Sequence, residues 1–173
     1  GFLKGAEVNL EREVKLAEVR AEEAARVKKL RAEEATASVM ARPELIVTVS
    51  GAAVESVGGL AGRYTRTTVE VGGTTRVAWK FEGTFVSKKG TELDDVYITR
   101  ADTGGLVVDL LRYWKEDGRV SNMGLILSSG NCFAALISGE QTFCWNYDDG
   151  SDEDYVVSRD VSILAPLDPS LSA

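Results

Sequence analysis

The sequence contains no histidine. Histidine is the commonest general base, a frequent metal ligand and the usual pH switch of proteins. Its absence excludes Ser-His-Asp and Cys-His nucleophile systems from this chain. A zinc site would have to use carboxylates and the only two cysteines. We therefore expect no metal and no cofactor, and the absence favours binding over catalysis.

Long apolar runs and a basic surface are also missing. No stretch approaches the ~18 apolar residues of a membrane span, and GFLKGAEVNLERE shows no apolar secretion signal. The net charge is -7, with nine Lys/Arg and eight Asp/Glu in residues 1–43 and eleven and nineteen in the remainder. Nucleic acid is not an expected partner, because phosphate contacts need clustered positive charge. We expect a soluble protein of unassigned location; a start without Met also fits a processed protein of an organelle.

What the sequence does contain begins with a helix-forming segment. Residues 6–40 are rich in Ala, Glu, Arg, Lys, Leu and Val, and no Gly or Pro occurs between Gly5 and Pro43. The pattern predicts one helix of roughly 35 residues, about 52 Å long. Pro43 disfavours helical backbone at Arg42 and marks the end. Residues 1–43 are therefore predicted to form an extended N-terminal helical arm.

The apolar residues of this arm form two thin stripes, one at heptad spacing and one offset from it. Glu11–Lys15 and Glu22–Arg26 add favourable i,i+4 charge pairs. One interpretation is a solvated helix lying over its own β domain; the favoured one is an arm that docks onto another protein, as a coiled coil or in a groove. The predicted docking residues are Leu10, Val14, Ala17, Ala21 and Ala24 in the first stripe and Leu16, Val19, Val27 and Leu30 in the second.

The periodicity changes at Glu44, where short β-branched segments separated by turn residues begin. Gly72-Gly73 predicts a two-residue hairpin. LVVDLLRYW is predicted as a strand because Asp117-Gly118 follows as a turn, although its apolar spacing also fits a short helix. About nine or ten strands predict an antiparallel meander that closes as a small barrel or sandwich. The expected class is α+β, mainly β, with a β domain over residues 44–166 and a tail over residues 167–173.

The densest acidic cluster lies in WNYDDGSDEDY. Its residue order does not match a calcium loop of the EF-hand type. We expect a solvated inter-strand loop that serves as an acidic docking patch for a basic partner surface. A loose calcium or magnesium site, or an enzyme that uses these acids or Asp95 or Asp109, remains an alternative. The loop acids are Asp148, Asp149, Asp152, Glu153 and Asp154.

Two further sets of residues are candidates for a role. Trp79, Trp114 and Trp145 fall on predicted strands, where they either fill the core or stack against a ligand. Cys132 and Cys144 flank a predicted hairpin. They form either a disulfide, as in an oxidising compartment, or two buried free thiols.

Taken together, these features predict a non-catalytic structural or adaptor subunit. The helix would dock onto a larger protein assembly, and the acidic β domain would cap or bridge its neighbours. The alternative is a β-barrel or sandwich that binds a carbohydrate or a small apolar molecule.

Overall fold

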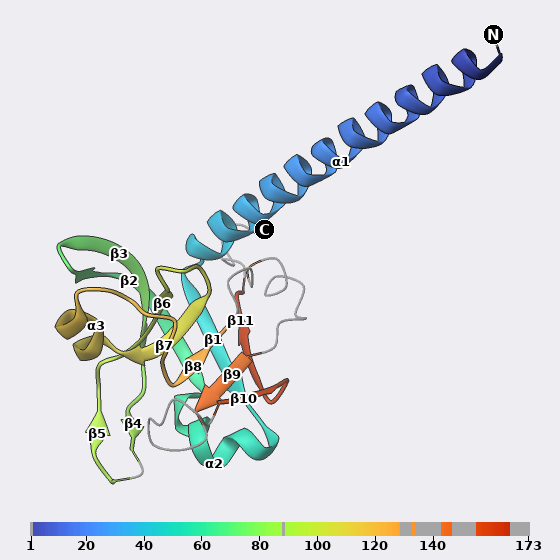
Figure 1. Ribbon diagram of the computed structural model, residues 1–173. Coiled ribbons are helices and arrows are strands. Elements are labelled where there is room, and N and C mark those ends of the chain that lie inside the picture. The colour runs from blue at the N-terminus through green and yellow to red at the C-terminus, as the bar shows by residue number, and fades with distance from the viewer. Residues whose placement is uncertain (1, 88, 129–132, 134–142, 147–154, 167–173) are drawn as a thin grey trace, which may run out of the picture.

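The computed structural model of the chain describes residues 2–87, 89–128, 133, 143–146 and 155–166. A long N-terminal helix is followed by an antiparallel sheet that is curled into a half-barrel (Figure 1). The class is α+β and mainly β, which confirms the prediction.

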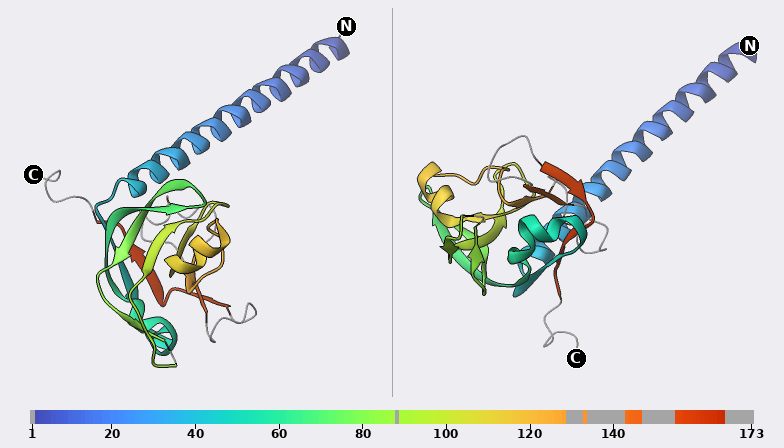
Figure 2. Two further views of the ribbon diagram at one scale, coloured as in Figure 1. Left: turned by 90° about the vertical axis from the view of Figure 1, so that its left-hand side faces the viewer. Right: turned by 90° about the horizontal axis from the view of Figure 1, so that it is seen from below.

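Helix α1, Phe2–Met40, forms one unbroken arm of 39 residues. At ~1.5 Å per residue it is about 58 Å long. Residues 7–34 are all exposed, whereas Ala35 and Val39 are buried among the residues of the barrel core. The arm projects away from the barrel in every view (Figures 1 and 2). Only its last two turns contribute to the folded body.

The described strands of the main sheet follow one another as a meander. Every neighbouring pair is antiparallel, in the order β10-β9-β8-β7-β6-β3-β2-β1-β11. The strands are β1 Glu44–Val49, β2 Gly62–Val71, β3 Thr74–Phe81, β6 Val96–Arg100, β7 Leu106–Leu110, β8 Ile126–Leu127, β9 Phe143–Asn146, β10 Tyr155–Ser158 and β11 Val161–Leu164, with a separate small hairpin of β4 Phe85–Val86 and β5 Glu92–Leu93.

The last two strands hold the opposite edges of the sheet together. β10 and β11 lie at the two ends of the strand order, yet only Arg159 and Asp160 separate them in the chain. Because all pairs are antiparallel, β10 and β11 run in the same sense relative to the sheet. The chain therefore turns a corner there instead of forming a hairpin. The Asp160 carbonyl accepts a hydrogen bond from the Ser50 N–H at 2.8 Å, which continues the β1–β11 ladder to this corner.

Short helical segments that were not predicted cover the barrel end opposite α1. η1 Gly51–Ala53, α2 Val54–Val57 and η2 Gly58–Leu60 connect β1 to β2. Ala53, Val57 and Leu60 are buried in the core. The segment lies at the bottom of the barrel in Figure 1, whereas α1 ends at the top.

The prediction that LVVDLLRYW is a single strand is wrong in its second half. Leu106–Leu110 forms β7, but Leu111–Asp117 forms helix α3. Asp95 stabilises the start of α3, because its carbonyl and Oδ2 accept hydrogen bonds from the N–H groups of Leu111 (2.9 Å) and Arg112 (3.3 Å). Gly118 ends the helix in the left-handed conformation, at φ 71°, as a C-cap glycine does.

The Gly72-Gly73 hairpin is confirmed between β2 and β3. Both glycines have positive φ, 59° and 78°. A Cβ on Gly72 would lie 2.2 Å from the Gly118 carbonyl oxygen, whereas a Cβ on Gly73 would meet nothing within 4 Å. Gly72 is therefore needed for the close approach of the hairpin to the end of α3.

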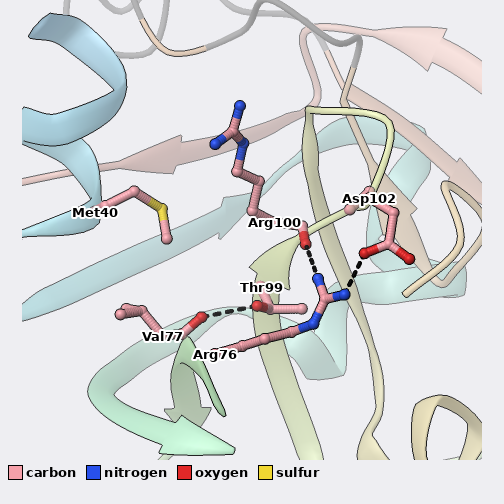
Figure 3. Close-up of a pocket in the computed structure, with 7 residues that line it drawn as sticks. Met40, Arg76, Val77, Thr99, Arg100 and Asp102 are labelled. Carbon is pink, nitrogen blue, oxygen red and sulfur yellow. Dashed lines mark hydrogen bonds and ion pairs between the residues drawn. The ribbon is translucent and has the colours of Figure 1, made fainter. Parts of the chain in front are cut away.

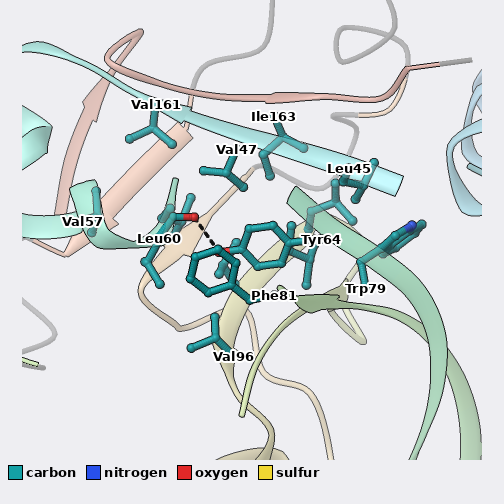
Figure 4. Packing of buried hydrophobic residues seen from close by; sticks show 14 of the residues in the cluster. Leu45, Val47, Val57, Leu60, Tyr64, Trp79, Phe81, Val96, Val161 and Ile163 are labelled. Carbon is teal, nitrogen blue, oxygen red and sulfur yellow. Dashed lines mark hydrogen bonds between the residues drawn. The ribbon is translucent and has the colours of Figure 1, made fainter. Parts of the chain in front are cut away.

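Apolar side chains pack on both faces of the curved sheet. Inside the barrel, Tyr64 stacks on Phe81 with ring centroids 4.7 Å apart, and its hydroxyl donates to the Leu60 carbonyl at 2.7 Å (Figure 4). On the outer face, Trp114 of α3 packs in a second cluster with Val69, Val71, Ala78, Ala101, Val107 and Val120. The barrel interior is filled by side chains.

We predict that Val39→Ala lowers the free energy of unfolding by about 2 kcal/mol, because it leaves a cavity in the core. Val14→Ala is the matched control, since Val14 lies on the same helix and is exposed; it should change stability by less than ~0.5 kcal/mol. Urea unfolding measures both variants. Equal effects would show that the end of α1 is not part of the cooperative unit.

Candidate functional site

The junction of α1 with the barrel is fixed by burial and by hydrogen bonds to backbone carbonyls. Arg66 Nε donates to the Met40 carbonyl at 2.9 Å, and Trp79 Nε1 donates to the Arg42 carbonyl at 3.0 Å. The Arg66 N–H also bonds the Pro43 carbonyl at 2.9 Å. Carbonyls at a helix end lack partners within the helix, so these donors stabilise the junction. The arm therefore leaves the barrel in one defined direction.

The exposed part of the arm carries large apolar side chains that no other part of the described chain covers. Their exposed fractions range from 38% to 63%. Every predicted docking residue lies in this part, and the alanines Ala17, Ala21 and Ala24 are exposed as well. Val8 belongs to the second stripe, 11 residues before Val19, and was not predicted. The large side chains are Val8, Leu10, Val14, Leu16, Val19, Val27 and Leu30.

The structure places two of the three tryptophans in the cores. Trp79 is 0% and Trp114 is 2% exposed. Neither ring presents a face to solvent on which a sugar could stack. Trp145 lies on β9, and its side chain lies outside the described residues.

The predicted acidic loop and one cysteine of the predicted disulfide fall outside the part of the chain that the structure describes. Asp148, Asp149, Asp152, Glu153 and Asp154 lie outside the described residues, as does Cys132. The backbone of Cys144 lies on β9, paired with Leu127 and Val157. Within the described ranges, no group of three or more Cys, Asp and Glu side chains could hold a metal ion.

Asp95 and Asp109, the carboxylates of the enzyme alternative, differ in their surroundings. Arg112 binds Asp95 through two hydrogen bonds, Nε–Oδ2 at 2.8 Å and Nη2–Oδ1 at 2.7 Å. These bonds hold the pKa of Asp95 below its usual value. Burial raises the pKa of Asp109 to about 7, and the negative charge of Asp95 adds to the effect.

A raised carboxyl pKa suits a general acid, and the Asp109 side chain is half-buried. It lies on β7 opposite Tyr97. A Cβ on Gly124 would lie 3.1 Å from the Asp109 Cβ and 2.9 Å from the Val108 carbonyl oxygen, so the segment at Gly124 packs directly over this strand. The Asp109 side chain is thus half-buried, with the segment at Gly124 close to its Cβ.

A depression of about 370 Å³ lies at the end of the barrel where α1 enters. Arg76 donates to the Arg100 carbonyl at 3.4 Å and forms an ion pair with Asp102 (Figure 3). The Arg100 guanidinium lies 5.6 Å from the centroid of the Phe133 ring. The lining residues are Met40, Arg76, Val77, Thr99, Arg100, Ala101 and Asp102. They come from separate strands and from the end of α1, so no local sequence motif indicates the depression.

Comparison of the chain with known protein families, with curated proteins and with solved structures gives no match. In the part of the chain that is described, no helix has the length and apolar character to cross a membrane. The function has to be inferred from the residues and geometry of the chain.

We predict that Asp109→Asn stabilises the protein above neutral pH. The folded pKa of Asp109, about 7, lies above the value of about 4 in an unfolded chain. The unfolded state therefore releases this proton first, and the stability of the native protein falls as pH rises between these values. At pH 8 the variant should gain about 1–2 kcal/mol and should lose most of this pH dependence.

Urea unfolding between pH 5 and pH 8 checks the Asp109 prediction. The control is Asp94→Asn, because Asp94 is exposed. It should leave the pH dependence of the wild-type protein intact. A destabilised Asp109→Asn variant with an unchanged pH dependence would contradict the prediction.

Proposed function

We propose that the protein is a non-catalytic structural subunit that docks onto a larger protein assembly through α1. The observation that supports this most directly is the run of exposed residues 7–34, which holds seven large apolar side chains. Monomeric proteins seldom leave such a surface uncovered. An isolated helix is also only marginally stable in water, and packing of its apolar face against a partner stabilises it.

The hydrogen-bonded junction between the C-terminal end of α1 and the barrel supports the same proposal. Because the arm leaves the barrel in one direction, a partner that binds the arm also sets the position of the barrel. The segment from residue 44 onward has nineteen acids against eleven basic residues. In this proposal the barrel caps or bridges neighbouring subunits, and the acids at residues 148–154 face a basic partner surface. The absence of histidine supports a role without catalysis.

We predict that a chain beginning at Glu33 folds but loses its protein partners. This truncation keeps Ala35 and Val39, which belong to the core, and removes the exposed arm. Affinity purification of the tagged full-length and truncated chains from the source cells, followed by quantitative mass spectrometry, compares their partners. The thermal unfolding of the purified truncated chain should match that of the full-length barrel.

Two substitution variants separate specific docking from loss of the helix. Leu10→Glu/Val14→Glu places charge in the first stripe and should lose the same partners as the truncation. Arg12→Gln/Arg20→Gln changes exposed polar positions of the same helix and should keep them. Recovery of identical partners by the full-length and truncated chains would show that α1 is not the docking element.

A second candidate function is ligand binding at the barrel mouth. The depression of about 370 Å³ has the size of a small-molecule site. Arg76 is paired with Asp102, which also lines the depression, so the positive charge of the lining comes from Arg100. This charge suits a small phosphate or carboxylate better than the carbohydrate or apolar ligand considered from the sequence.

Calorimetric titration with inorganic phosphate tests this second candidate. We expect Arg100→Ala to abolish the binding heat. Arg119→Ala should keep it, because Arg119 is an exposed arginine outside the depression. No binding heat with the wild-type protein would contradict a phosphate site.

A further inference from the structure

Arg42 is the only charged residue that is buried in the described part of the chain, with 8% of its surface exposed. It lies between the end of α1 and Pro43, where the chain enters the barrel. The Arg42 N–H donates to the Val39 carbonyl at 2.9 Å, and the Arg42 carbonyl accepts from Trp79 Nε1 at 3.0 Å. These bonds fix the Arg42 backbone at the junction of α1 with the barrel.

The Arg42 guanidinium has no ion pair with any described residue. Its Nη2 donates to Ser38 Oγ at 3.1 Å, whereas its Nη1 is buried and has no hydrogen-bond partner in the described part of the chain. The ion pairs of the described residues use other arginines, namely Arg63, Arg76 and Arg112. Arg42 therefore buries a positive charge to which no described carboxylate is bound.

A buried charge without a counter-charge is strongly unfavourable. A buried lysine or carboxyl group can avoid this cost by losing its charge, but an arginine keeps its charge in proteins. An orphaned buried donor in a native structure also needs an explanation, such as a bound ion or water. The burial of Arg42 therefore calls for a compensating negative charge at the junction.

The C-terminal end of α1 supplies only part of this negative charge. The last carbonyls of a helix carry a partial charge of roughly half an elementary charge, which favours a nearby cation. Two of these carbonyls already accept hydrogen bonds, Val39 from the Arg42 N–H and Met40 from Arg66 Nε. The helix end therefore cannot balance the whole charge of the Arg42 guanidinium.

We propose that a small monovalent anion binds at Arg42, between the last turn of α1 and the barrel. Arg42 Nη1 is the first donor to this anion. The Ser38 hydroxyl accepts from Arg42 Nη2, so its own O–H is a second donor. The burial of Arg42 favours a small ion such as chloride over a bulky one. The net charge of -7 disfavours a multivalent anion.

An anion at this position stabilises the junction of α1 with the barrel. Ser38 lies in the last turn of α1, whereas the Arg42 backbone is bonded to Trp79 of β3. An anion that contacts Ser38 and Arg42 therefore links the helix to the sheet. The unfolded chain does not hold these two donors together, so the anion binds the native state and shifts the unfolding equilibrium towards it.

The anion site at Arg42 is separate from the depression at the barrel mouth. Met40, Arg76 and Arg100 line the depression, but Ser38 and Arg42 do not. Ser38 and Met40 are two residues apart on α1, which is about 200° of rotation, so they lie on nearly opposite sides of the helix. A ligand at Arg100 and an anion at Arg42 can therefore be told apart by substitution.

Urea unfolding of the full-length chain at increasing chloride concentration tests the anion site. Methanesulfonate, a bulkier monovalent anion, replaces chloride to keep the ionic strength constant. We expect the equilibrium constant for unfolding to fall about tenfold between ~1 and ~100 mM chloride. Arg42→Met should abolish this dependence, because it removes the charge and the donors.

Two arginines serve as matched controls for Arg42→Met. Arg63→Met is the same substitution at a side chain that is 57% exposed and paired with Glu44. Arg100→Met removes the charge of the depression. Both variants should keep the chloride dependence of the wild-type chain. Ser38→Ala removes only the second donor, so it should move the chloride midpoint to a severalfold higher concentration.

A crystal of the wild-type chain soaked in sodium bromide gives a test that does not depend on any variant. Anomalous scattering should place a bromide ion within hydrogen-bond distance of Arg42 Nη1 and Ser38 Oγ. A water molecule at this position in place of bromide would overturn the proposal.

Three results of the unfolding experiment would also overturn the anion site. The first is a wild-type unfolding constant that does not change with chloride. The second is a chloride dependence that Arg42→Met keeps. The third is a dependence that Arg63→Met or Arg100→Met removes as completely as Arg42→Met does. None of these results bears on the docking role of the exposed arm, because a chain beginning at Glu33 retains the anion site.

Discussion

The burial of Val39 in the barrel core is the constraint on which the rest of the structure depends. It makes the last turns of a long, otherwise solvated helix part of the folded body. The Arg66 and Trp79 side chains then bond the carbonyls of Met40 and Arg42, where the helix has no donors of its own. A helix without this junction would be a loosely tethered segment. With it, α1 holds its surface in a defined position relative to the sheet.

The same junction is linked to the curling of the sheet into a half-barrel. β1 follows α1 after three residues and lies between β2 and β11. Its Leu45 and Val47 side chains are 0% and 1% exposed, in the core that also receives Val39. β11 reaches β1 only because the chain turns a corner at Arg159 and Asp160. The strand that completes the sheet and the helix that extends from it therefore depend on one set of core contacts, and a loss of packing there would disturb both.

Composition and turn residues were enough to predict most of the fold. The absence of Gly and Pro between Gly5 and Pro43 predicts most of α1, and the Gly72-Gly73 pair predicts the β2–β3 hairpin. Both signals are local in the sequence. Helix α3 was missed because its start depends on Asp95, which lies 17 residues before Arg112 in the chain and meets it only in the folded state. Gly118 was interpreted as a turn residue, although a C-cap glycine gives the same signal.

The candidate sites show the same difference between signals that are local in the sequence and contacts that form only in the folded state. The exposed stripes of α1 could be predicted because helical spacing is a property of consecutive residues. The burial of Trp79 and Trp114 could not, since a strand or helix residue faces the core or the solvent according to its neighbours in space. The depression at Arg76 and Arg100 could not be predicted from local sequence patterns either. Its lining residues meet only through strand pairing and at the end of α1.

A partner would contact different surfaces on the two stripes of α1, because only the first stripe lies on the side of the helix that packs on the barrel. The first stripe continues along the helix towards Ala35, where the barrel begins. A partner that follows it towards the barrel therefore reaches the barrel mouth, close to the depression that Met40 lines. A partner on the second stripe, which holds Leu16, Val19, Val27 and Leu30, would meet the helix alone. The first stripe is thus the one from which a partner would reach both the arm and the barrel.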